Sequence, residues 1–147
     1  MKNFAPVFFA AALAGCNSVN IKPGTLDKSE TIFADRGGYS MKHALKQELE
    51  ERGHKVIVGK FVDGASNEEF SWEKSDPMGA RYVVRVQERA PRFSPLICLF
   101  NGWRWWVFNV SIADQKTGEE LLAWTGRGCA SANVRRLRRL MDEVEKK

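Results

Sequence analysis

Two histidines and three cysteines are the residues of this 147-residue chain whose side chains most readily do chemistry. His43 and His54 have neither a cysteine nor paired carboxylates at the spacing of a metal site, so we expect structural roles for both. The sequence contains no Gly-rich phosphate loop and no Gly-x-Ser-x-Gly nucleophile motif. We therefore expect no catalytic residue, no metal and no cofactor. The cysteines Cys16, Cys98 and Cys129 remain to be explained.

Cys16 ends a stretch that is typical of a secretory signal peptide. Lys2 is followed by an uncharged apolar run over residues 4–14, which is shorter than the ~20 residues of a membrane-spanning helix and fits the apolar core of a signal peptide. The run ends in Leu-Ala-Gly-Cys, which resembles the lipobox of bacterial lipoproteins. The resemblance implies a diacylglycerol on Cys16 and, after cleavage before it, an acyl chain such as palmitate on the new amino group. The alternative is a chance cysteine in an ordinary signal peptide or in a buried N-terminal helix.

The lipobox divides the chain into a signal peptide (1–15), a polar lipid-anchored tether (16–30) and a single domain (31–147). Asn17 follows the cysteine, and the absence of an aspartate there implies, by the same resemblance, a lipid-anchored location at the outer membrane, facing the periplasm. The formal charge of +5 is spread over side chains of both signs, unlike the clustered basic surface of a nucleic-acid-binding protein. We expect a membrane contact through the anchor and no nucleic-acid partner.

The domain is predicted to combine two helices with a sheet. A helix is indicated over residues 40–53, where Ser40 can cap the first turn and Gly53 can end the last. A second helix, capped by Ser131, carries an apolar stripe down to residue 144. Strands are predicted over residues 31–34, 54–62, 81–89 and in a hairpin over 103–128. These elements predict an α+β fold: a mostly antiparallel sheet of four to five strands with two helices packed on one face.

This layout is similar to that of small bacterial lipoprotein domains, namely those of the curli-secretion lipoprotein and of the lipoprotein activator of a penicillin-binding protein. The likeness is carried by the lipobox and by the hairpin sequence VSIADQKTGEELLAWTGRG, residues 110–128. The likeness concerns the arrangement of helices and strands, and it implies no functional residue.

The hairpin has one apolar and aromatic face. Gly118 suits the left-handed position of a type I turn with a G1 bulge, and this turn sets the pairing of the two strands. A shift by one residue would place Thr125 and Arg127 on the apolar face, so the register is well specified. The glycines of the second strand make room for the rings of the first. The predicted pairs are Ile112 with Leu122, Val110 with Trp124, Phe108 with Gly126 and Trp106 with Gly128.

The opposite face of the sheet is the candidate binding surface. Trp103 and Trp105 point to this face in the predicted register, together with Arg127, and Arg85 and Arg89 lie on the corresponding face of the preceding strand. Tryptophan and arginine are over-represented at binding hot spots. The sequence therefore favours a non-catalytic lipoprotein that binds another envelope protein or a second copy of itself.

Three alternatives stay open for this surface. The same tryptophans could stack on peptidoglycan or on a surface glycan. A second alternative is an enzyme of envelope maintenance, although no base and nucleophile are arranged for it. The loop over residues 63–79, which contains Phe70 and Trp72, could instead fold over the face and hide it.

Cys98 and Cys129 present a choice between two structures. An oxidising compartment and an even number of cysteines favour a disulfide. Asn101-Gly102, however, is a strong signal for a tight hairpin, which would place the cysteines on either side of one strand, ~9.5 Å apart. A disulfide needs Cα atoms within ~7 Å, so the two structures exclude each other. Prolines at positions 91 and 95 disfavour a regular strand before Cys98 and thereby favour the disulfide.

The lipid anchor predicts the behaviour of one variant. Cys16→Ser removes the only thiol of the lipobox, so acyl labelling should be lost and an unprocessed precursor should accumulate. Metabolic labelling with a palmitate analogue, together with the mass of the purified protein, measures both. A mutant that is still cleaved and still carries lipid would contradict the anchor.

Overall fold

The computed structural model describes residues 17–36, 38–59 and 79–146. Seven strands and two helices occur in these residues. They are β1 (Ser18–Ile21), β2 (Thr31–Asp35), α1 (Met41–Glu51), β3 (Lys55–Gly59), β4 (Tyr82–Glu88), β5 (Arg92–Phe93), β6 (Arg104–Asp114), β7 (Glu119–Cys129) and α2 (Ala130–Glu145).

The strands form one sheet in the order β1-β7-β6-β4-β2-β3, and the short β5 pairs with β6 beyond the end of β4. Strands β1, β7, β6 and β4 are antiparallel neighbours, whereas β2 is parallel to both β3 and β4. The predicted α+β class is confirmed. The sheet differs from the prediction, because it is mixed and has seven strands. The pair β2–β3 is parallel because α1 connects them, and a helical crossover returns the chain to the end of the sheet at which it started.

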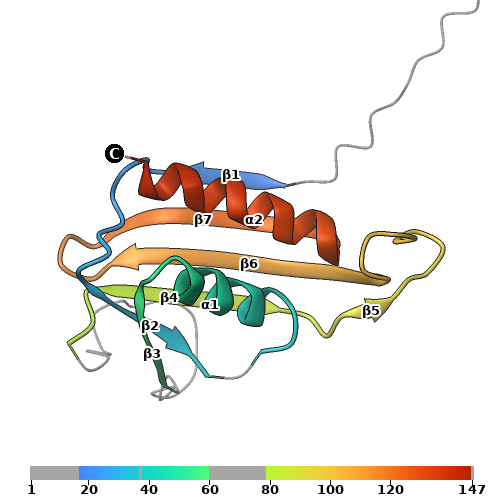
Figure 1. Cartoon of the computed structure of the whole chain (residues 1–147), viewed down its shortest axis with the longest axis horizontal. Helices are drawn as coiled ribbons and strands as arrows, with labels where there is room; N and C mark the ends of the chain where they lie inside the picture. The colour runs from blue at the N-terminus through green and yellow to red at the C-terminus, as the bar shows by residue number, and fades with distance from the viewer. Residues whose placement is uncertain (1–16, 37, 60–78, 147) are drawn as a thin grey trace, which may run out of the picture.

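Both helices cover the same face of the sheet, as predicted (Figure 1). Helix α1 packs on β3 and β4, and helix α2 packs on β7. Each helix contributes an apolar stripe, and the sheet contributes alternate residues of its central strands. The largest fully buried side chains of this core are Trp124, Tyr82, Ile32, Met41, Leu45, Leu49, Ile112, Leu122, Leu137 and Met141.

The β6–β7 hairpin has the predicted register at all four pairs, and Gly118 has the expected positive φ of 70°. A bulge lies after Ile112, where the pairing shifts by one residue. A Cβ atom at Gly126 would come within 2.5 Å of the Phe108 ring, so only glycine fits opposite this ring. Phe108 also packs edge-on against Trp124, with ring centroids 4.6 Å apart. The space left by Gly126 therefore lets two aromatic rings fill the core side of the hairpin.

The first turn of α1 differs from the prediction. Ser40 precedes the helix, but its hydroxyl donates to Glu88 and caps no helical N–H. The Glu88 carboxylate, at the end of β4, instead accepts from the backbone N–H groups of Tyr39, Met41 and Lys42. An anion at this position also suits the positive end of the helix dipole. The predicted end of α1 is confirmed, since Gly53 follows the helix with a φ of 84°.

The start of α2 also differs from the prediction. The helix begins at Ala130 directly after β7, so Ser131 lies inside its first turn and does not cap it. The Ser131 N–H donates a hydrogen bond to the carbonyl of Asn101, which belongs to a loop distant in the sequence. Both helix starts are therefore capped by groups from other parts of the fold.

The segment before residue 31 belongs to the domain and not to a free tether. Strand β1 pairs with β7 at the edge of the sheet. The hydroxyl of the buried Tyr82 donates to the Thr25 carbonyl and accepts from the Asp27 N–H. Leu26 is buried beside it. These contacts place residues 18–27 on the body of the protein, in a segment whose polar sequence predicted only a tether.

The packing of the hairpin predicts unequal effects for two tryptophans. Trp124→Ala should lower the free energy of unfolding by about 3–5 kcal/mol, because the ring is 1% exposed and its removal leaves a cavity. Trp103→Ala is the matched control and should cost far less, since that ring is 46% exposed. Denaturant unfolding of both variants measures the difference. Losses of equal size would contradict the different burial of the two rings.

The capping carboxylate predicts a pH-dependent stability. Burial by itself would raise the pKa of Glu88, but the hydrogen bonds from Tyr39, Ser40, Lys42 and Met41 lower it below the ordinary 4.5. Its stabilising effect is therefore fully present above that value and is lost as the pH falls through the lowered pKa of the folded state.

Glu88→Gln should thus destabilise the protein by about 1–2 kcal/mol at neutral pH and by much less at about pH 3. Urea unfolding at both pH values measures this change. Glu143→Gln, at an exposed position of α2, is the control and should have little effect at either pH. A deficit for Glu88→Gln that is as large in acid as at neutral pH would show that the carboxylate charge is not the cause.

Candidate binding surface

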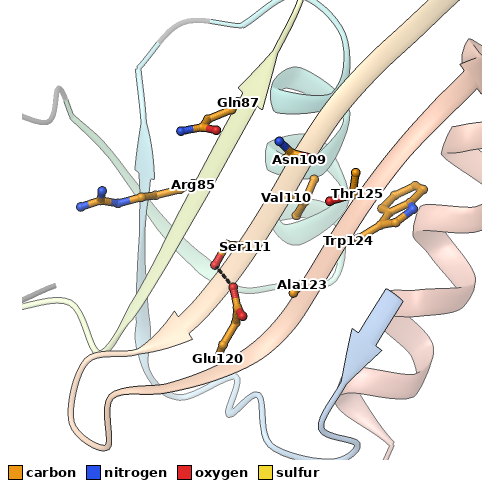
Figure 2. Close-up of a pocket in the computed structure, with 9 residues that line it drawn as sticks. All are labelled: Arg85, Gln87, Asn109, Val110, Ser111, Glu120, Ala123, Trp124 and Thr125. Carbon is orange, nitrogen blue, oxygen red and sulfur yellow. Dashed lines mark hydrogen bonds between the residues drawn. The ribbon is translucent and has the colours of Figure 1, made fainter. Parts of the chain in front are cut away.

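The face of the sheet opposite the helices presents polar side chains from three neighbouring strands. A shallow depression of about 350 Å³ lies on this face, and Figure 2 shows the side chains that line it. The Ser111 hydroxyl there donates to the Glu120 carboxylate at 2.6 Å. Val110 and Trp124 belong to the same strands, but they are buried and point to the helix side. The polar residues along the depression are Arg85, Gln87, Asn109, Ser111, Glu120 and Thr125.

Further along the same face, arginines flank apolar residues of β6. Val107 lies between Arg89, whose N–H donates to the Val107 carbonyl at 3.0 Å, and Arg127, its partner in β7. Trp105, two residues earlier on β6, is paired with Arg92 of β5. Residues directly opposite in neighbouring strands share a face. These five residues therefore form one patch, which we call the arginine–tryptophan cluster.

The structure brings together three of the five predicted contact residues. Trp105, Arg89 and Arg127 belong to the cluster. Arg85 does not, because its partner Ser111 lies four residues from Val107 on β6, about 13 Å away at the rise of a strand. Trp103 is not part of the cluster either, since it precedes β6 and lies in the neighbouring loop with a φ of 60°.

Arg92 is the contact residue that the sequence did not reveal. It lies in a strand of only two residues, and that strand exists because β6 extends beyond the end of β4. The flanking prolines at positions 91 and 95 break any alternating pattern around it. The basic residue between the prolines is the one available signal, and it does not indicate a strand.

The cluster lies in a strongly basic part of the chain. No aspartate or glutamate occurs in residues 89–113 or 121–141, which supply all of its side chains. Among the described residues, none of its three arginines forms an ion pair. A guanidinium group binds a carboxylate or phosphate through two parallel hydrogen bonds. The cluster is therefore suited to an anionic group on a partner.

The loop over residues 94–103, called here the apolar loop, is attached to the end of β7 by a disulfide. Cys98 and Cys129 are bonded, with Cα atoms 5.4 Å apart. The predicted disulfide is thus confirmed, and the competing tight hairpin at Asn101-Gly102 is excluded. In its place the Cys98 carbonyl accepts from the N–H groups of Asn101 and Trp103.

A second charged cluster joins the ends of the two helices. Arg52 donates to Glu48, Asp142 and Glu145, and the buried His54 pairs with Glu145. Burial alone would lower the pKa of Arg52, but its bonds to the three carboxylates raise it above its ordinary value. Burial would likewise raise the pKa of Glu145, while His54 and Arg52 lower it. These mutually bonded groups hold α1 to α2, which is a structural role for His54.

Several predicted features fall outside the described residues. Cys16 is one of them, and residues 60–78, which include Phe70 and Trp72, are another. In the part of the chain that the structure describes, no group of three histidines, cysteines or carboxylates could hold a metal ion. None of the described helices is long and apolar enough to cross a membrane.

The fold is similar to that of a known bacterial protein. The sequence matches no protein-family model and no curated protein. Among solved structures, a single-residue variant of the PelC dodecamer from Paraburkholderia phytofirmans superposes with a TM-score of 0.55 at 14% identity, covering 88% of this chain and 98% of PelC. A second PelC structure gives 0.52 at 13% identity and covers 89% and 99% of the two chains. The lipoprotein GNA1162 from Neisseria meningitidis gives 0.44 at 13% identity over 71% and 83%. This chain thus has the fold of PelC.

Proposed function

We propose that this protein is a non-catalytic lipoprotein, anchored through Cys16 at the periplasmic side of the outer membrane, that binds another protein of the cell envelope. The arginine–tryptophan cluster is the contact. The proposal assigns no reaction to the protein and needs no metal or cofactor.

The observation that carries this proposal is the arrangement of three arginines around Trp105 and Val107. The cluster offers a half-buried ring and an apolar side chain at its centre, with charged groups at its edge. Protein interfaces combine an apolar centre with a polar rim in the same way. The basic rim selects a partner whose surface carries carboxylates, because like charges would oppose contact.

A second copy of this chain is the second candidate partner. Strand β7 begins with Glu119 and Glu120, both exposed, at the far end of the hairpin, about 30 Å from Trp105 at the rise of a strand. Glu119 is paired there with Lys22 at 2.6 Å. One hairpin therefore has a basic end and an acidic end. Such ends allow a head-to-tail contact, and this type of contact closes into a ring when the rotation permits. PelC, which shares the fold, is a dodecamer.

Peptidoglycan or a surface glycan is the third candidate, with Trp105 as a stacking platform. The half-buried ring is less available for stacking than a fully exposed one. The three arginines favour a carboxylate-rich protein over a neutral sugar. A glycan therefore remains the alternative and not the leading assignment.

The cluster predicts which position captures a partner. A photoreactive residue in place of the exposed Arg127 should cross-link to one envelope protein in intact cells, whereas the same residue at exposed Lys116 in the far turn should not. Substituting Arg89→Glu and Arg92→Glu in the same chain should reduce the cross-link at least tenfold, since each truncated hot-spot contact is worth about 1–2 kcal/mol. The cross-linked species is identified by mass spectrometry.

The outcomes separate the candidates. An adduct of twice the chain mass that is lost with Glu119→Lys and Glu120→Lys assigns the cluster to self-association. An adduct that is removed by a muramidase assigns it to peptidoglycan. Equal yields from positions 127 and 116, or yields unchanged by the two charge reversals, would falsify the cluster as a contact. Thermal unfolding of each variant should match the parent chain, because exposed substitutions change stability little.

A further inference from the structure

The apolar loop exposes large hydrophobic side chains to an unusual degree. Six of the seven large hydrophobic residues that are exposed in the described part of the chain lie within residues 93–103. Leu96 and Phe100 are 95% and 86% exposed. A soluble monomer rarely gathers exposed apolar residues in one place, so such a patch marks a contact with a partner or a membrane.

The loop is held in this exposed form by contacts on its inner side. The disulfide of Cys98 joins it to β7, and the Cys98 N–H donates to the Ser94 carbonyl at 2.9 Å. Asn101 fixes the other half, because its carbonyl accepts from Ser131 and its side chain accepts from Arg135 of α2. These contacts hold the loop on its inner side, while the side chains of Leu96 and Phe100 are exposed.

The apolar loop lies at the end of the sheet where the lipid anchor would be attached. The Asn17 side chain accepts from the Arg127 N–H at 3.0 Å, and Arg127 precedes the disulfide-bonded Cys129 by two residues. Cys16 directly precedes Asn17 in the sequence. Figure 1 shows the start of β1, the start of α2 and this loop together at one end of the molecule. Acyl chains on Cys16 would therefore hold this end at the bilayer.

The charge of this end fits an anionic lipid surface. Arg104 is exposed beside Trp103, and Arg135 is exposed on α2 where it contacts the loop. The nearest stretches of chain, residues 89–113 and 121–141, contain no acidic residue. Arginine near an anionic leaflet is attracted to the lipid phosphates, and tryptophan favours the interface between headgroups and acyl chains. An acidic protein surface would use the arginines but would leave the leucines and Phe100 without a matching contact.

We propose that the apolar loop inserts into the phospholipid leaflet that holds the Cys16 anchor, with Leu96, Ile97 and Phe100 among the acyl chains and Arg104 and Arg135 at the phosphates. This proposal rests on the anchor of the proposed function. It gives the lipoprotein a second membrane contact besides the acyl chains on Cys16, which alone suffice for stable attachment. The second contact fixes the orientation of the sheet and places the arginine–tryptophan cluster close above the membrane surface.

The test uses the processed protein purified from cell membranes, after its mass has established acylation at Cys16. The protein is reconstituted into vesicles of phosphatidylethanolamine and phosphatidylglycerol with or without brominated acyl chains, which quench tryptophan fluorescence only within the bilayer. The parent chain should be quenched. Trp103→Phe, which keeps the apolar ring and removes the reporter, should show at least twofold less quenching. The double variant Leu96→Asp and Phe100→Asp should show the same loss.

Tyr39→Asp is the matched control, because Tyr39 is the remaining large hydrophobic residue that is exposed and lies at the start of α1, outside the loop. Its quenching should equal that of the parent chain. Thermal unfolding should be unchanged in all three variants, so that a loss of quenching reports contact and not misfolding.

Other outcomes overturn the proposal. Quenching that is absent in the acylated parent chain, or that survives Trp103→Phe and the double Asp variant, places the loop outside the bilayer. Loss of cross-linking between copies in the double variant, with quenching unchanged, assigns the loop to a protein interface. A mass without acyl groups refutes the anchor itself, and that result is distinct from a failure of the loop to insert.

Discussion

Phe108 and Gly126 lie opposite each other in the β6–β7 hairpin, and the remaining structure depends on this pairing. The ring of Phe108 occupies the space that a Cβ atom at Gly126 would fill, so the two strands cannot slide past each other without a clash or a cavity. Side chains alternate along a strand, so a slip by one residue would turn the apolar face outwards. The register therefore decides at once which residues form the core beneath the helices and which reach the open face.

The register of the hairpin also decides which residues lie on the open face, the face of the sheet opposite the helices. With Trp106, Phe108 and Trp124 committed to the core, Trp105 and Arg127 must face the other way. Arg89 and Arg92 join them because β4 ends where β5 begins, so two different strands flank β6 along its length. A contact surface of basic and aromatic residues is thus the reverse side of the same hairpin that fills the core.

The molecule is polarised from one end of the sheet to the other. Near the β6–β7 turn and at the ends of both helices, carboxylates are paired with Lys22, Arg52 and Arg81. The opposite end carries the three arginines of the cluster, the apolar loop and the start of β1. The disulfide contributes to this division, since it holds Cys98 and the exposed loop at the basic end. The fold is shared with PelC at 14% identity, and a fold by itself does not specify a function. The assignments made here rest on the side chains gathered at the basic end.

Features that depend on local periodicity and turn chemistry could be predicted from the amino-acid sequence. The hairpin register, the apolar stripes of the two helices and the end of α1 at Gly53 all follow from spacing that is readable along the chain. Other features required the tertiary structure, because they join residues far apart in sequence. Strand β1 forms because it can pair with the edge strand β7. Strand β5 forms because β6 extends beyond the end of β4 and leaves residues there to pair with. Glu88 caps α1 from β4, a contact that no pattern near Ser40 indicates. Compartment and parity favoured the disulfide, but local turn signals also allowed a hairpin. The disulfide forms because the tertiary structure brings the loop close to two distant segments. Asn101 accepts a hydrogen bond from α2 and Cys98 is bonded to the end of β7, and both partners are more than twenty-five residues away in the sequence.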